Sequence, residues 1–154
     1  MNGLDLSQLK HEIVAPALAA IRFSSPDAIS LVTGTALAES RGVYVKQLGT
    51  GPALSLWQME PATHEDIWTN FLAYRADLRG RVSALLSSSG RLRNLLSNLD
   101  YGAAMCRVHY LRSPLAIPST AEGMAALHKS HYNSALGAAN ASENVALFAL
   151  AISA

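Results

Sequence analysis

Apolar residues recur every three or four positions along most of the chain, which is the spacing of an amphipathic helix. This pattern predicts a helix over residues 4–20, in which Pro16 should cause a kink or break near Ala15. Residues 26–39 are apolar around most of their circumference, and Ser25 precedes them as a suitable N-cap. We therefore expect a central, buried helix that ends close to residue 39.

The same spacing predicts four more helical segments, over residues 61–72, 94–111, 119–131 and 141–153. Thr63 with Asp66 should cap the first of these segments, and Asn140 with Glu143 should cap the last. The chain therefore alternates helices with short connections through most of its length.

The remaining stretches are typical of connections. Residues 41–53 are rich in turn residues and should form a loop with a short strand over 43–45, and residues 54–59 should form a short irregular return. The basic stretch 75–93 is expected to be a solvated surface with a connecting loop. Together these patterns predict a mainly α protein, a single domain over residues 1–154, with about six or seven helices and at most a minimal β element.

Composition narrows the class of protein. Half of the residues are hydrophobic and 15% are charged, which indicates a packed globular domain. The net charge of +1 argues against a nucleic-acid binder that works by neutralising phosphates. The single cysteine, Cys106, is expected to be a buried structural thiol.

The N-terminal residues do not have the pattern of a secretory signal, because Asp5 and Glu12 interrupt the apolar stretch. The most apolar run, residues 145–152, is far shorter than the roughly 20 residues that span a bilayer. We expect synthesis in the cytoplasm without membrane insertion.

Glu39 is the candidate catalytic residue. It follows an apolar helix, and the apolar residues Leu56 and Trp57 are expected to fold back against it. Burial among apolar groups favours the protonated form of a carboxyl group. A protonated acid is what the bridging oxygen of a glycoside needs when its bond breaks.

Four short motifs, in a fixed order, surround this acid. They are Glu39-Ser40, SLWQMEPAT at 55–63, NLDYGAA at 98–104 and HYNSA at 131–135. The ordered set resembles the catalytic domain of the lytic transglycosylases, members of the lysozyme-like superfamily that cleave the glycan strands of peptidoglycan. The resemblance covers residues 35–136 and implies a lysozyme-like fold.

The resemblance also implies a mechanism. Glu39 would donate a proton to the bridging oxygen and then take a proton from the 6-hydroxyl of the same sugar, closing a 1,6-anhydro-muramic ring. This reaction needs no metal and no cofactor. The implied partner is the peptidoglycan glycan strand.

Five further residues acquire roles from the resemblance. Ser40 and Gln58 would hydrogen-bond the substrate near the cleaved bond, and Met59 would line a saccharide subsite. Tyr132 would position Glu39 or stabilise developing charge, and Asn133 would order the turn that follows.

Other functions stay open. Glu60 stands where the family has an apolar residue, and a second carboxylate could activate water, as in a hydrolytic lysozyme. Ser55 and Trp57 also depart from the motif, which leaves a catalytically idle glycan-binding or virion structural relative as a further alternative. The setting expected for an enzyme is a phage lysin, either released at holin-dependent lysis or carried in a virion, that acts on the cell wall.

His128 and His131 lie three residues apart, but no acidic or cysteine partner stands at metal-ligand spacing from them. We therefore expect no metal site, and we interpret both histidines as surface or site-rim residues.

Overall fold

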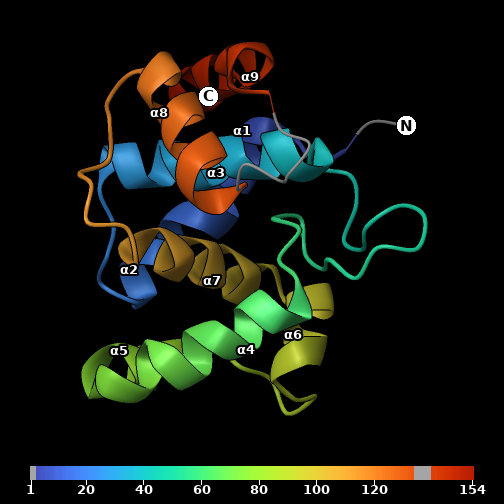
Figure 1. The fold of residues 1–154 in the computed structure, drawn as a ribbon, viewed down its shortest axis with the longest axis vertical. Coiled ribbons are helices and arrows are strands. Elements are labelled where there is room, and N and C mark those ends of the chain that lie inside the picture. The colour runs from blue at the N-terminus through green and yellow to red at the C-terminus, as the bar shows by residue number, and fades with distance from the viewer. Residues whose placement is uncertain (1–2, 134–139) are drawn as a thin grey trace.

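The computed structural model describes residues 3–133 and 140–154, which are mainly helical (Figure 1). Its segments are α1 (Leu6–Gln8), η1 (Leu9–Val14), α2 (Ala15–Ala20), α3 (Pro26–Ser40), α4 (Pro61–Asn70), η2 (Leu72–Tyr74), α5 (Ala76–Ser83), α6 (Arg91–Ser97), α7 (Leu99–Leu111), α8 (Ala121–Leu127), η3 (His128–Tyr132) and α9 (Ala141–Ser153). The prediction of a mainly α class is confirmed. In the described ranges, β pairing is limited to isolated bridges that Leu54 forms with Lys46 and Met59, so the strand predicted over 43–45 is wrong.

Helix α3 is the central element, as the sequence predicted. It begins where Ser25 Oγ accepts a hydrogen bond from the N–H of Ala28, at 3.1 Å. Helices α8 and α9 cover one side of it in Figure 1, and α2 and α7 lie on the other. Gly34 is required at the contact with α9, because a Cβ atom there would overlap the ring of Phe148.

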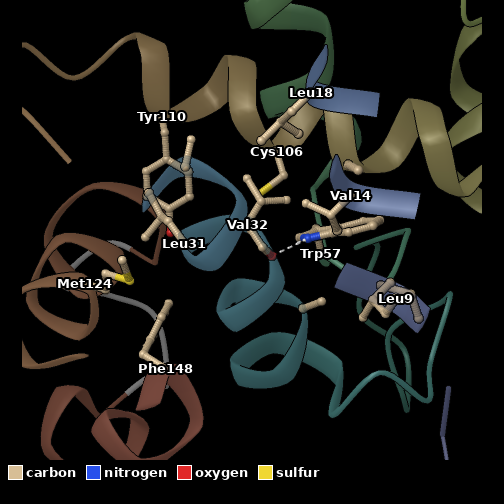
Figure 2. Close-up of a cluster of buried hydrophobic side chains, with 14 of the residues drawn as sticks. Leu9, Val14, Leu18, Leu31, Val32, Trp57, Cys106, Tyr110, Met124 and Phe148 are labelled. Carbon is tan, nitrogen blue, oxygen red and sulfur yellow. Dashed lines mark hydrogen bonds between the residues drawn. The ribbon is translucent and has the colours of Figure 1, made fainter. Parts of the chain in front are cut away.

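Two clusters of buried side chains hold the fold. The first surrounds α3 and includes Val32, Trp57, Cys106 and Phe148 (Figure 2). The second lies between α7 and the helices α4, α5 and α6, and it includes Tyr101. Helix α7 contributes to both clusters. It therefore lies between the part of the molecule around α3 and the part formed by α4, α5 and α6.

Of the kink or break predicted near Ala15, the break is wrong, and the irregularity is a change from π-helical to α-helical geometry at that residue. In a regular helix, the proline ring would collide with the carbonyl four residues before it. Here η1 is a π-helical stretch, and the N–H of Ala15 bonds to the carbonyl of Lys10. The wider turn makes room for the ring, so the chain continues without a break into α2.

The helix predicted over 94–111 is instead two helices. Asn98 has an extended backbone (φ −128°, ψ 100°), and its Oδ1 accepts the N–H of Tyr101 to cap α7. The apolar stripe continues across this cap, so periodicity alone did not reveal it. The basic stretch 75–93 is also more regular than predicted, because it contains α5.

The two predicted caps have different outcomes. Asn140 caps α9 as predicted, since its Oδ1 accepts the N–H groups of Ser142 and Glu143. The predicted cap at Thr63 is wrong: α4 already begins at Pro61, directly after the extended residue Glu60. Proline is well suited to a first helical position, where no N–H is needed.

Candidate active site

Glu39 lies in the last turn of α3 and lines a cavity of about 320 Å³, called here the Glu39 cavity. The helix ends because Arg41 takes a left-handed conformation, with φ of 57°. The side chain of Glu39 is 12% exposed. The carboxylate is therefore largely shielded from water but still borders the cavity.

Two side chains from beyond α8 bind the carboxylate of Glu39. His128 Nε2 lies 2.7 Å from Oε1, and Asn133 Nδ2 donates to the same oxygen at 3.3 Å. His128 is completely buried, so the expectation of a surface or rim histidine is wrong for this residue. The ring lies inside because η3 packs His128 against α3 and against Phe148 of α9.

The turn over residues 54–59 carries the second predicted motif to the Glu39 cavity. Leu54 and Met59 exchange backbone hydrogen bonds of 2.9 and 2.8 Å, and Gln58 has a left-handed φ of 45°. The indole N–H of Trp57 donates to the carbonyl of Val32 at 2.8 Å, which fixes the turn on α3 (Figure 2). As a result, Gln58 and Met59 both line the cavity with Glu39.

Tyr132 connects the fourth motif to this turn. Its hydroxyl donates to the carbonyl of Trp57 at 2.6 Å. Its ring stacks on Tyr110 and on His128, with centroids 5.2 and 5.8 Å apart. Burial raises the pKa of Tyr132 well above its ordinary value, so the hydroxyl keeps its hydrogen for this bond. Both Tyr132 and Asn133 line the Glu39 cavity, whereas residues 134–135 of the motif lie outside the described residues.

Ser40 is the predicted site residue that the structure does not bring to the cavity wall. It is 2% exposed, and its hydroxyl donates to the carbonyl of Ala36 at 3.1 Å. The same oxygen accepts the N–H of Gly42 at 3.2 Å. In this arrangement, the hydroxyl of Ser40 helps to end α3 and does not face a ligand.

A further wall of the cavity is formed by Thr63, His109, Arg112 and His131. The place of His131 agrees with its interpretation as a site-rim residue, whereas the sequence did not single out His109 and Arg112. Burial, with Arg112 close by, lowers the pKa of His109 to about 3, so this ring is neutral. The ring of His131 donates from Nε2 to the carbonyl of His109 at 2.7 Å, and Arg112 pairs with Asp66. His109 and Arg112 are three residues apart at the end of α7, a spacing that is typical of residues on one face of a helix. This spacing does not show whether that face lines a cavity.

Glu60 borders the same cavity from the exposed position before α4. The cavity therefore has two carboxyl-bearing residues, one shielded and one open to water. Across the described ranges, no group of three or more histidine, cysteine, aspartate or glutamate residues is arranged to hold a metal ion.

No protein-family model matches the chain, and no curated protein or solved structure is significantly similar to it. Within residues 3–133 and 140–154, no helix has the length and apolar character needed to cross a bilayer.

Proposed function

We propose that this protein is a peptidoglycan lytic transglycosylase with a lysozyme-like fold, in which Glu39 is the only acid and base. The proposal depends above all on one observation: the shielded carboxylate of Glu39 borders a cavity with Gln58, Met59, Tyr132 and Asn133. These residues come from three motifs that are far apart in the sequence. Their convergence supports the proposal, because a shielded acid beside a cavity is suited to protonating the oxygen of a glycosidic bond.

In the proposed reaction, Glu39 protonates the oxygen between N-acetylmuramic acid and N-acetylglucosamine while the C1–O bond of muramic acid breaks. The 6-hydroxyl oxygen of that sugar bonds to C1, and its hydrogen passes to the Glu39 carboxylate. Atoms balance without a water molecule, and Glu39 returns to its protonated form. Because nucleophile and electrophile belong to one sugar, their proximity lowers the barrier.

Mass spectrometry of fragments released from purified peptidoglycan tests this proposal. We expect 1,6-anhydro-muramic ends from the unaltered protein. Glu39→Gln should lower the rate by about 10²- to 10⁴-fold, because the amide cannot transfer the proton, while circular dichroism stays unchanged. Glu60→Gln is the matched control and should keep most of the activity. Undiminished cleavage by Glu39→Gln would refute the assignment.

Hydrolysis to reducing muramic acid is the second candidate, because Glu60 borders the same cavity as Glu39. A second carboxylate can activate water on the opposite face of the sugar. In that case, the products would carry reducing ends, and Glu60→Gln would be as inactive as Glu39→Gln. Glycan binding without any product would instead favour the idle relative. The setting as a phage lysin or a virion-borne enzyme stays a prediction.

A further inference from the structure

We propose that His128 is a positioning residue, a neutral Nε2–H donor that holds Oε1 of Glu39 so that the transferable proton resides on Oε2. The inference rests on the proposed role of Glu39 in catalysis. It adds a specific protonation pattern to that role, and His128 needs no contact with the substrate.

The two hydrogen bonds to Glu39 show which of its carboxyl oxygens accepts hydrogen bonds from the protein. His128 Nε2 and Asn133 Nδ2 both approach Oε1, at 2.7 and 3.3 Å. The amide nitrogen of Asn133 can only donate, so Oε1 acts as an acceptor toward this residue. If His128 also donates, Oε1 is the carbonyl-like oxygen, and a proton on the carboxyl group must sit on Oε2.

The other nitrogen of His128 decides the direction of its bond. Nδ1 is buried, and within the described part of the chain it has no hydrogen-bond partner. If Glu39 donated to Nε2, or if the ring were charged, Nδ1 would carry a hydrogen with no acceptor. Buried N–H groups without a partner are rare and costly, and a bare ring nitrogen avoids that donor. The neutral ring with its hydrogen on Nε2 is therefore favoured.

The surroundings of His128 are consistent with an uncharged ring. It stacks on Tyr132, and its centroid lies 5.7 Å from that of Phe148 on α9. On α7, Cys106 and Tyr110 interact electrostatically with Glu39, and burial raises the pKa of each, so both keep their hydrogens. Glu39 on α3 is therefore the ionisable group that affects the protonation of His128 directly, through their hydrogen bond.

The π-helical geometry of η3 explains how both donors reach one oxygen. The N–H of Asn133 bonds to the carbonyl of His128 at 2.7 Å, a step of five residues. In an α-helix, residues five apart point to different faces, whereas here the π turn is wider and Asn133 follows it as the C-cap, with a non-helical backbone (φ −107°, ψ 89°). The local distortion therefore has a role: it places His128 and Asn133 on the same side of Glu39.

Nitrogen NMR of the histidine rings in the unaltered protein tests the inference without measuring activity. The His128 signals, assigned by their absence in His128→Gln, should show a hydrogen on Nε2 and none on Nδ1 at pH 7. Replacing Glu39 with alanine should shift the Nε2 hydrogen resonance. A hydrogen on Nδ1, in a neutral or a charged ring, would overturn the inference even if the protein cleaves peptidoglycan.

Two substitutions then separate positioning from packing. His128→Gln keeps an uncharged N–H donor and should stay within about tenfold of the full kcat, whereas His128→Leu should lose roughly 10²-fold in kcat with little change in KM. His64→Gln, at a buried histidine away from the cavity, is the control and should leave kcat unchanged. Equal kcat values for the glutamine and leucine variants would refute the positioning role. If the protein proves inactive, the proposed function fails, while the NMR result still decides the state of His128.

Discussion

Two buried histidines in this protein have opposite surroundings. His128 is completely buried and meets the carboxylate of Glu39 at 2.7 Å, beside the Glu39 cavity. His64 is 2% exposed and meets the hydroxyl of Tyr101 at 2.6 Å, on the other side of α7. The two residues are of the same type and similarly buried, so they differ in their partners. His128 binds a carboxylate at the candidate site, whereas His64 binds a tyrosine hydroxyl in the core.

His64, Tyr101 and Trp68 form a buried hydrogen-bonded group whose members are all uncharged at neutral pH. The indole N–H of Trp68 donates to the Tyr101 oxygen at 2.9 Å, which leaves the hydroxyl hydrogen for His64. Burial, assisted by the nearby Arg91, lowers the pKa of His64 to about 4. Burial also raises the pKa of Tyr101 to about 12. At neutral pH, this network therefore joins α4 to α7 through neutral hydrogen bonds.

The largest stability effect is expected from Tyr101→Phe. The change keeps the ring but removes the hydroxyl that pairs with both His64 and Trp68. Two buried polar groups without partners should cost about 2–4 kcal/mol of the free energy of unfolding, measured by urea denaturation. The proposed peptidoglycan cleavage, measured at a temperature where the variant is folded, should be unchanged. Lost cleavage in a folded variant would show that the two regions are not independent.

Gly102→Ala should produce the next largest effect, and it should affect both regions. A Cβ atom at Gly102 would lie 2.5 Å from Ser55 Oγ and 3.0 Å from the ring of Trp57. We expect a loss of about 1–3 kcal/mol from overpacking, in thermal or urea denaturation. The proposed cleavage should also fall, because the turn that holds Gln58 must move. Full activity would contradict this coupling between α7 and the turn.

Acid should destabilise the protein partly through His64. The unfolded chain takes up its proton near the ordinary pKa of 6.5, but the folded chain resists protonation until about pH 4. The contribution to stability is therefore complete above pH 6.5 and is lost as the pH falls toward 4. His64→Gln should reduce the drop in unfolding free energy between pH 7 and 4.5 by about 2 kcal/mol. Parallel curves for the two proteins would exclude His64 as a source of the acid sensitivity.

Gly80→Ala gives the smallest effect, and its sign is opposite to that of Gly102→Ala. Gly80 lies within α5, and a Cβ atom there would have no heavy atom within 4 Å. Alanine should stabilise the helix by about 0.5–1 kcal/mol because it restricts the unfolded chain. Thermal denaturation of both variants measures the contrast, and a loss of stability at Gly80 would show that the surroundings of α5 are misjudged.

Local rules predicted the elements better than their interruptions. The apolar pattern gave the mainly helical class and the buried course of α3, and Ser25 and Asn140 cap helices as expected. The interruptions were missed because they depend on the backbone conformation of a few residues. Examples are the extended cap residue Asn98 and the π turn before Pro16. Apolar spacing continues across such positions, so it does not report them.

The motifs predicted which residues lie close together in the fold. Five of the residues named from the sequence, Glu39, Gln58, Met59, Tyr132 and Asn133, line one cavity together with Glu60. Ser40 could not be assigned correctly from its position beside Glu39, because its hydroxyl completes the end of α3. His109 and Arg112 were missed because a helix pattern does not say which end faces a cavity.

What the sequence determined by itself was local: where helices begin, which faces are apolar and which acid ends the central buried helix. Only the tertiary structure decided that His128, 89 residues away from Glu39, is the histidine that meets it. The physical reason is that periodicity describes one face of one helix. The partner of that face depends on how α3, η3 and the turn over residues 54–59 pack together, and no local pattern encodes that choice.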